Sequence, residues 1–452
     1  MHQPTPLPDD DITSRQGELE QLVRDLLERA AARGASAAEA GVSLAAGFEV
    51  TVRMGEVETL QHQRDRGLAL TVYFGQRKGS ASTADFSRAA IEEALESACS
   101  IARHTAEDPC AGLAEPELMA RDLPDLDLYH PWRLTPEDGI ELARMCEDSA
   151  RGLDARISNS EGASVETQRA LQVYGNSHGF VGARRGTRHG ISCAVIGRSG
   201  ESMQRDFWYT VGRDAALLED AEAVGREAAR RTVRRLGAER LSTREVPVLF
   251  VPQTARGLIA HLVGAVSGGS LYRNASFLVD SLGRQLFPEG VRIHEQPRLP
   301  GALGSAAFDA EGVATADRDL VRDGVLQGYV LDSYSARRLG MQTTGNAGGV
   351  HNLTVEPGRL DFDGLLREMG EGLVVTELMG QGVNIVTGDY SRGAAGFWVS
   401  GGELRQPVEE VTVAGNLADM LRRIVAVGKD MDLRSNVRCG SILIERMTVA
   451  GE

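Results

Sequence analysis

The stretch FEVTVRMGEVETLQHQRDRGLALTVYFGQRKGSAST, residues 48–83, decides the fold expected for the N-terminal part of the chain. Val50 and Val52 alternate with polar residues, which is the pattern of a strand with one buried face. RDRG (64–67) and FGQRKG (74–79) end in glycines and are expected to form turns. The stretch therefore predicts a meander of short antiparallel strands.

Helical segments flank this meander, and the same order of elements returns later in the chain. Leu22, Leu26 and Leu27 recur at helical spacing before the meander, and Gly34 is expected to end that helix. A second helix is expected after the meander, in SRAAIEEALESACSIARH. Strands covered by helices predict a two-layer α+β unit. Because helix, glycine-punctuated strands and helix occur twice, we treat a structural duplication as a hypothesis.

The length of 452 residues exceeds one usual hydrophobic core, so we expect several domains in an α+β protein. The expected divisions are a disordered leader (1–18), an N-terminal α+β unit (19–107), a proline-rich linker (108–135), a second α+β unit (136–242) and a β-rich C-terminal domain (243–452). A few helices are expected within the C-terminal domain, at residues 254–266, 332–340, 363–370 and 416–426.

The net charge of −15 argues against general binding to nucleic-acid backbones, which needs a basic surface. The basic stretch RRTVRRLGAER (230–240) is expected to form the charged face of a surface helix. Five scattered cysteines without a C-x-x-C pair are typical of a reducing compartment. The polar N-terminus and the lack of an 18-residue apolar run predict a cytoplasmic protein that does not enter a membrane.

Motifs that would reveal a catalytic or metal-binding residue are absent from the sequence. It contains no H-E-x-x-H, no cysteine–histidine cluster with zinc spacing, no G-x-S-x-G elbow and no phosphate-binding loop ending in Lys-Ser/Thr. His294 with Glu295, and His351, stand in polar segments and are expected to be solvated loop residues.

The helix expected over 254–266 has an apolar stripe and a face of small residues. Leu258, Leu262 and Val266 share the stripe, whereas His261 lies towards Gly257, Gly264 and Ala265. No neighbour on that face offers a second metal ligand. The residues alone therefore favour His261 as an ordinary packed histidine.

Three stretches closely resemble the PmbA/TldE branch of the TldD/PmbA family, also called the modulator of DNA gyrase family. They are MGEVETLQHQRDRGLALTVYFGQRKGSASTADFS (54–87), HLVGAVSGGSLYRNASFLVDSLG (261–283) and EEVTVAGNLADMLRRIVAVGKDMDLRSNVRCGSILIERM (409–447). The resemblance covers nearly the whole chain beyond the leader. It implies a two-subunit zinc peptidase system of the bacterial and archaeal cytoplasm that trims leader peptides from modified peptides, including a gyrase-directed microcin.

The same resemblance implies that this chain lacks the zinc centre of the TldD branch. That branch carries H-E-x-x-x-H and a cysteine in C-G-K-D, and a zinc-bound water attacks the peptide bond. The corresponding positions here are His261, Leu262, Val266 and Val427. Three of these four side chains are apolar, so no catalytic or metal-binding residue is assigned to this chain, and zinc is expected in a TldD-like partner.

Family likeness also suggests partners and a surface. The implied assembly is a heterodimer with a TldD-like paralogous chain around a cavity that takes unfolded peptide as an added strand, and a homodimer of the isolated chain is left open. Arg392 and Trp398, in the hairpin 388–403, are candidates for the cavity or the interface. A strand core with a solvated turn is the competing interpretation of that hairpin.

Three hypotheses of function remain open from the sequence, as does the question of whether the chain is an enzyme. The first is a non-catalytic subunit of a TldD/TldE-type metallopeptidase that processes unfolded or leader peptides. The second is a metallopeptidase of this family that is active by itself. The third is a homodimeric protein that binds peptides without cleaving them.

Overall fold

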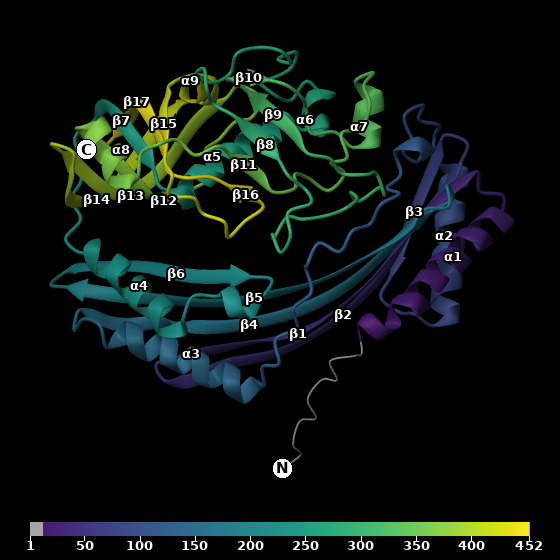
Figure 1. Ribbon diagram of the computed structural model, residues 1–452, viewed down its shortest axis with the longest axis horizontal. Coiled ribbons are helices and arrows are strands. Elements are labelled where there is room, and N and C mark those ends of the chain that lie inside the picture. The colour runs from purple at the N-terminus through teal and green to yellow at the C-terminus, as the bar shows by residue number, and fades with distance from the viewer. Residues whose placement is uncertain (1–11, 452) are drawn as a thin grey trace.

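The computed structural model describes residues 12–451, in which a long curved sheet carries helices on one face and the C-terminal domain over the other (Figure 1). The strands of this sheet lie in the order β3-β2-β1-β4-β5-β6, and every neighbouring pair is antiparallel. They are β1 (Ala37–Arg53), β2 (Glu56–Phe74), β3 (Arg77–Thr83), β4 (Ile157–Asn176), β5 (Val181–Ser199) and β6 (Ser202–Gly212). Both expected α+β units therefore contribute to one sheet, in an architecture that confirms the α+β class.

The join between the two units is the pairing of β1 with β4. It runs from Glu39 opposite Asn176 to Val52 opposite Ala163, without a register shift. Even-numbered residues of β1, such as Val42 and Val50, are buried on the outer face, and the odd-numbered residues point to the inner face under the C-terminal domain.

Four helices cover the outer face: α1 (Gln16–Ala32), α2 (Arg88–His104), α3 (Pro136–Arg151) and α4 (Ala221–Arg234). The pair α1 and α2 buries one half of β1 in a first hydrophobic cluster, and the pair α3 and α4 buries the other half in a second. Helix, three strands and helix thus occur twice in the chain, as the sequence pattern indicates.

The turn expected at RDRG (64–67) is wrong, because β2 continues through it. Arg64, Arg66 and Gly67 pair with β1 opposite Ala46, Leu44 and Ser43. A continuous ladder of backbone hydrogen bonds to β1 outweighs the local preference of one glycine. The turn expected at FGQRKG is confirmed, since Gly75 adopts a φ of 63° between β2 and β3.

The disordered leader expected over residues 1–18 is wrong for its described part, and residues 1–11 lie outside the described residues. A 3-10 turn spans Thr13–Arg15, and α1 starts directly after it. Ile12 and Leu19 are buried in the first hydrophobic cluster, so apolar contacts hold the start of this helix.

The expected linker 108–135 contains one short 3-10 turn, Pro116–Leu118, and otherwise lacks regular structure. It is nevertheless packed between the sheet and the C-terminal domain. Met119 and Leu126 lie in a cluster with Phe180 of the sheet and Phe308 of the C-terminal domain. Residues 108–135, called the strap below, therefore pack against both the sheet and the C-terminal domain.

The C-terminal domain contains two sheets with the orders β14-β13-β12-β7-β17-β15 and β10-β9-β8-β11-β16. Its strands are β7 (Arg244–Phe250), β8 (Ile293–Glu295), β9 (Arg318–Arg322), β10 (Val325–Leu326), β11 (Leu353–Val355), β12 (Gly372–Met379), β13 (Asp389–Ser400), β14 (Glu403–Asn416), β15 (Ile424–Val427), β16 (Val437–Arg438) and β17 (Ile442–Ala450). Its helices are α5 (Pro252–Ala265), α6 (Gly268–Leu271), α7 (Ser333–Arg338), α8 (Phe362–Met369) and α9 (Leu417–Arg422).

Helices are found near all four positions expected in this domain, but the one expected over 416–426 is too long. It ends at Arg422, and β15 begins at Ile424 and pairs with β17. Ile424 and Val427 are β-branched and buried, so pairing in the sheet is favoured over another helical turn. No helix within residues 12–451 has the length and apolar character needed to cross a membrane.

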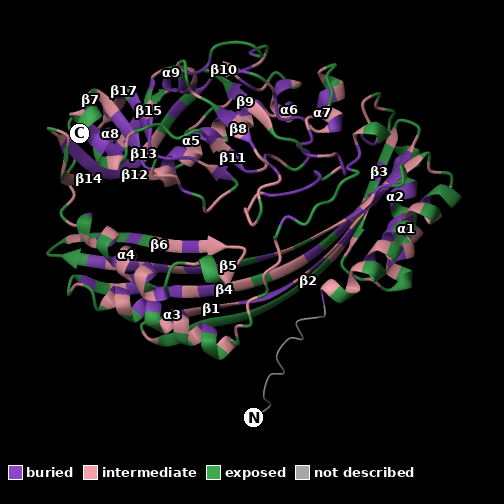
Figure 2. Ribbon diagram, in the orientation of Figure 1, coloured by how far each residue is buried: buried purple, intermediate pink, exposed green. Residues whose placement is uncertain are grey.

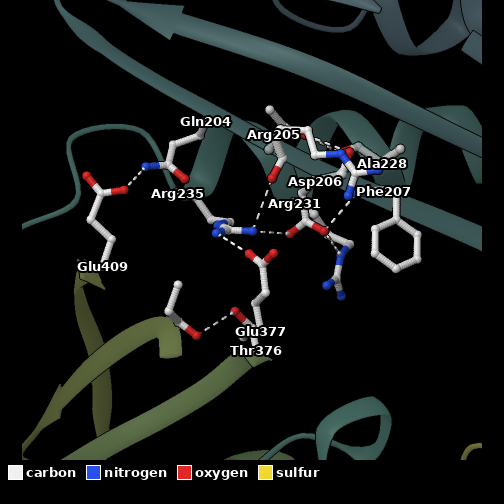
Figure 3. A network of polar contacts seen from close by, with 12 residues as sticks. Gln204, Arg205, Asp206, Phe207, Ala228, Arg231, Arg235, Thr376, Glu377 and Glu409 are labelled. Carbon is white, nitrogen blue, oxygen red and sulfur yellow. Dashed lines mark hydrogen bonds and ion pairs between the residues drawn. The ribbon is translucent and has the colours of Figure 1, made fainter. Parts of the chain in front are cut away.

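A network of charged residues ties the sheet to the C-terminal domain (Figure 3). Arg235, which follows α4 and is only 8% exposed, lies 2.5 Å from the Glu377 carboxylate on β12 and 3.6 Å from that of Asp206 on β6. Its guanidinium also donates to the backbone carbonyl of Arg205 at 3.1 Å. The expectation that 230–240 forms the charged face of a surface helix holds for the exposed Arg230 and Arg234 of α4, whereas Arg235 is buried and paired with Glu377 across the two domains.

We predict that Gly225→Ala destabilises the protein. A Cβ at Gly225 on α4 would overlap the backbone carbonyl oxygen of Cys146 on α3, so the two helices would have to move apart. We expect the free energy of unfolding, measured in urea, to fall by about 1–3 kcal/mol.

Gly257→Ala is the matched control, because a Cβ there would meet no atom within 4 Å and alanine is the better helix former. Equal free energies of unfolding for the two variants would show that the α3–α4 contact is not as close as described.

Candidate functional site

Helix α5 carries His261 and fixes the direction in which it points. Val251 precedes the helix, and Pro252 occupies its first turn, where proline is favoured. Leu258 and Leu262 are buried on the core side. On the other side, a Cβ built at Gly257 or Gly264 would meet nothing within 4 Å, so the small-residue face beside His261 is uncovered by residues 12–451.

His261 is half-buried among groups from β13. The ring of Tyr390 meets its imidazole edge-on, with 6.1 Å between ring centroids. Burial lowers the pKa of His261 below 6.5, and the positive charge of Arg392 lowers it further. His261 is therefore a neutral imidazole at pH 7, and the positive charge of this surface comes from Arg392.

The other three positions of the implied zinc site are part of the hydrophobic core. Leu262, Val266 and Val427 are 1%, 0% and 7% exposed, and all three belong to the large cluster of the C-terminal domain. None of these side chains has an atom that can ligate a metal. His261 therefore has no co-ligand at these positions, and the residues present do not fit a zinc ion.

The segment VGKD (427–430) forms a tight turn with a structural role. The backbone carbonyl oxygen of Val427 accepts a hydrogen bond from Gly358, and the Gly428 amide donates to Ser441 at 2.7 Å. The Asp430 carboxylate accepts from the Ser441 hydroxyl and amide at 2.6 and 3.0 Å. Among the described residues, no three His, Cys, Asp or Glu side chains gather as metal ligands would.

The two candidates from hairpin 388–403 occupy different environments on β13. Arg392 shares a face of β13 with Tyr390, whose ring meets the His261 imidazole, and its positive charge lowers the pKa of that histidine. Trp398 is 7% exposed, and the Arg244 guanidinium lies over its ring at 5.0 Å. Within this chain Trp398 is thus a packing residue of the core, whereas Arg392 lies at the edge of the uncovered face of α5.

Tyr390 is a member of this surface that the sequence analysis missed. It is 2% exposed, and burial raises the pKa of its hydroxyl to about 12. Neither this hydroxyl nor the Nε of Arg392 has a hydrogen-bond partner within the described chain. The alternation of Tyr390 and Arg392 along a strand was the available signal, since it places both side chains on one face.

The expectation that His294, Glu295 and His351 are solvated is wrong. Glu295 is 2% exposed on β8, and its carboxylate accepts from Arg318 Nε at 2.8 Å and from the His351 amide at 2.5 Å. It also accepts from the Asn346 side chain at 2.8 Å. Burial of this carboxylate is compensated by an ion pair and two hydrogen bonds, which hold the glycine-rich loop before His351.

A groove of about 620 Å³ lies between the inner face of the curved sheet and the loop at Phe308. Its floor consists mostly of small residues from four strands, and Arg184 stacks at 4.1 Å on the ring of Phe308 at its rim. The lining includes Gly41, Ser43, Gly67, Ala69, Ser82, Ala84, Gln172, Tyr174, Asp309 and Ala310. Small side chains leave room for an extended chain to lie on this floor.

A second cavity of about 500 Å³ contains two glutamates from different domains. Glu39 on β1 accepts hydrogen bonds from the hydroxyls of Tyr73 and Tyr174, at 3.1 and 2.8 Å. Burial raises the pKa of Glu311 to about 7, although the Ser333 hydroxyl and amide donate to its carboxylate. Glu311 can therefore exchange a proton near neutral pH.

We predict that this carboxyl makes stability depend on pH. Between about pH 4.5 and 7 the folded chain binds more protons at Glu311 than the unfolded chain, so the free energy of unfolding falls as pH rises and levels off above 7. Glu311→Gln should remove this part of the slope, as measured by urea unfolding at pH 5, 6 and 7.5. An unchanged slope in the variant would contradict the raised pKa.

The chain matches all three domains of the PmbA/TldA metallopeptidases: domain 1 over residues 38–102, the central domain over 129–236 and the C-terminal domain over 243–451. It is 50% identical over 434 residues to the metalloprotease PmbA of Escherichia coli O157:H7, covering 96% of each chain. It is 47% identical over 441 residues to a PmbA homologue of Haemophilus influenzae, covering 97% of this chain and 98% of that one.

Two solved structures share the fold over nearly the whole chain. A Bacteroides thetaiotaomicron protein described as a modulator of DNA gyrase has a TM-score of 0.92 and 29% identity, over 97% of this chain and 100% of that one. TldE of Thermococcus kodakarensis has a TM-score of 0.83 and 23% identity, over 96% of this chain and 100% of that one, and this likeness shows the fold alone. From its three matched domains and its close relatives, the chain belongs to the PmbA/TldD family of metallopeptidases.

Proposed function

We propose that this protein is the non-catalytic subunit of a cytoplasmic two-chain metallopeptidase that processes unfolded or leader peptides. Its partner would be a TldD-like chain that holds the zinc ion and cleaves the peptide bond. The observation that carries the proposal is the burial of Leu262, Val266 and Val427, at 1%, 0% and 7% exposure, where a zinc peptidase of this family needs a base and ligands. A catalytic zinc site needs three protein ligands, and His261 alone cannot supply them.

A division of labour between two related chains is the arrangement that the resemblance to the PmbA/TldE branch implies. TldE is the name of one structural relative, and this chain has the same fold over 96% of its length. A subunit without its own zinc can still shape the chamber in which the partner cleaves. The uncovered face of α5 at Gly257 and Gly264 beside Arg392, and the groove on the inner face of the sheet, are the surfaces that we assign to peptide.

An extended peptide suits these surfaces physically. The groove is lined largely by small residues, so main-chain contacts rather than side-chain pockets would supply most of the affinity. Folded substrates cannot present a bare strand, which restricts entry to unfolded segments. We assign Arg392 to peptide contact. The Nε of Arg392 and the hydroxyl of Tyr390 have no hydrogen-bond partner within the described chain, and both lie beside the uncovered face of α5.

A second candidate is a peptidase that acts without a partner. It is favoured by the name of the Escherichia coli relative, a metalloprotease that is 50% identical to this chain. Under this reading, zinc would be held by residues other than those of the H-E-x-x-x-H pattern.

Metal content and partner dependence should distinguish the two functions. We expect the purified chain to hold less than stoichiometric zinc by elemental analysis and to leave an unstructured peptide intact. A TldD-like chain added to it should form a stable complex, and cleavage should then appear or rise. Stoichiometric zinc together with cleavage by the isolated chain would overturn the subunit assignment.

We also predict that His261→Ala leaves partner-dependent cleavage largely intact. The neutral, half-buried imidazole packs on Tyr390, so its loss should lower the free energy of unfolding by about 1–3 kcal/mol without removing a reacting group. Peptide cleavage by the complex and urea unfolding of the free variant measure the two effects separately.

The matched control is the corresponding His→Ala variant of the TldD-like partner, which should abolish cleavage. Loss of cleavage by a folded complex that contains the His261→Ala subunit would assign this histidine a direct part in the reaction.

A further inference from the structure

Arg184 is a half-buried cation on the rim of the groove at Phe308, and within residues 12–451 it forms no ion pair. Figure 2 shows its strand, β5, passing beneath the C-terminal domain, with buried, half-buried and exposed residues along its length. Two neighbouring arginines of β5 do have acidic partners. Arg185 lies 3.5 Å from a carboxylate oxygen of Asp125, and Arg188 lies 3.7 Å from one of Glu166. Arg184 therefore differs from these neighbours in carrying a charge that meets no carboxylate of the described chain.

Neutral groups hold the guanidinium of Arg184 in place. Its central carbon lies 4.1 Å from the centre of the Phe308 ring, and its Nη2 donates to the backbone carbonyl of Asp309 at 2.9 Å. Its Nε is buried and has no hydrogen-bond partner in the described chain. Burial lowers the pKa of Arg184 to about 10, so the side chain is still charged at pH 7. A guanidinium has five N–H donors, and this one retains donors for a further acceptor.

The carboxylate of Asp309 is fully buried and is occupied by backbone amides. One of its oxygens accepts from the amides of Glu311 and Val313, at 2.9 and 3.0 Å. The other accepts from the amide of Ala347 at 2.9 Å. Its charge acts on Arg184 only from a distance, and the effect of burial on the pKa of Arg184 is larger. Arg184 and Asp309 are the charged residues in the lining of the groove, so the groove offers its occupant a guanidinium without a direct ionic contact.

Polar side chains continue from Arg184 across the floor of the groove. Gln172 on β4 stands directly opposite Arg184, and Ser43 on β1 stands directly opposite Gln172. Opposite residues share a face of the sheet, and strands lie about 4.8 Å apart, so this row extends over roughly 10 Å. The side chains of Gln172 and Ser43 form no hydrogen bond within the described part of the chain. A ligand anchored at Arg184 can therefore make hydrogen bonds to both as it crosses the floor.

We propose that Arg184 binds a carboxylate of the peptide that occupies this groove. The inference rests on the proposed function, in which the groove holds peptide. A carboxylate has two acceptor oxygens in the geometry that a guanidinium matches with parallel hydrogen bonds. It also supplies the negative charge that a half-buried guanidinium needs to offset its desolvation. The same chemistry is available from the C-terminus of a peptide and from an aspartate or glutamate side chain.

The first test compares three peptides on the wild-type chain alone by isothermal titration calorimetry. All share one unstructured sequence of alanine, glycine and serine with an acetylated N-terminus. One has a free C-terminal carboxylate, one is amidated, and one is amidated and carries a single internal glutamate. We expect a carboxylate-bearing peptide to bind about tenfold more tightly than the neutral amide.

The comparison also identifies the source of the carboxylate. Tight binding of the free acid would assign the C-terminus, and tight binding of the glutamate peptide would assign an acidic side chain. Equal affinity for the three peptides, or no measurable binding of any of them, would overturn the proposal.

Arg184→Gln tests whether this residue is the origin of the preference. The three peptides should bind this variant with equal affinity, close to that of the neutral amide on wild type. Arg184→Lys keeps the charge but cannot form the parallel hydrogen bonds, so it should retain part of the preference. A preference that persists in full in Arg184→Gln would show that another group binds the carboxylate.

Arg188→Gln is the matched control. It removes the same charge from the same face of β5, at a position outside the lining of the groove. The preference for a carboxylate should remain as in wild type, whereas its loss would indicate a general effect of net charge and contradict the role of Arg184. Urea unfolding of each variant shows whether the fold is kept. If Arg184→Gln does not fold, the peptide series on wild type and on Arg184→Lys still decides the question.

A variant of the groove floor separates failure of this inference from failure of the peptide assignment. Ala69→Trp places a large side chain on an exposed position of the floor. Unchanged binding of all three peptides to this variant would show that they bind elsewhere, and both assignments would be wrong. If Ala69→Trp abolishes binding but wild type does not distinguish the three peptides, the groove holds peptide and only the role of Arg184 is wrong.

Discussion

The pairing of β1 with β4 is the constraint on which the rest of the structure depends. It converts two helix–strand units into one sheet, and its unbroken register from Glu39 to Val52 sets the length of the inner face. Helices cover the outer face only, so the inner face is free to carry the strap at Met119 and the C-terminal domain. The groove at Phe308 exists because the loop at Phe308–Ala310 spans the floor of small residues on this face without occupying the space above it. A slip of one residue between β1 and β4 would exchange the two faces and abolish this arrangement.

The curved sheet and the C-terminal domain are joined by apolar packing at the strap and by an ionic contact at Arg235. Apolar packing of Met119 and Leu126 holds the strap, whereas the buried Arg235 and Asp206 and the partly exposed Glu377 form an ionic contact near the far end of the sheet (Figure 3). Separation of the domains would expose the apolar strap and remove the Glu377 carboxylate from the buried Arg235 guanidinium, so the two domains are expected to behave as one body. The surfaces assigned to peptide therefore keep a fixed spacing, which favours selection of unfolded chains by shape and not by closure of a lid.

Local patterns in the sequence predicted most helices and strands, and the expectations that were wrong concern residues whose contacts lie far along the chain. The period of Leu258 and Leu262 predicted α5, and the structure confirms it. The expected face of small residues beside His261 is open at Gly257 and Gly264, but Ala265, which was expected on it, is buried in the core. The turn at RDRG was wrong because pairing with β1 is invisible in the sequence of β2. Partners far along the chain also decide two other exceptions. Glu295 is buried because it pairs with Arg318, and Arg235 is buried because it pairs with Glu377. Tyr390 was missed because only Arg392 and Trp398 were selected from the hairpin, and the shared face of Tyr390 and Arg392 was not considered.

The burial of Leu262 and Val266 makes a metal site on α5 difficult to build one substitution at a time. A glutamate at 262 or a histidine at 266 would place an unpaired polar group in a tightly packed cluster before the other ligands existed to compensate it. Each intermediate would lose stability and gain no metal, so selection would remove it. Polar side chains at the exposed edge of α5 can therefore change at less cost in stability than the buried positions at which a zinc centre would have to be built.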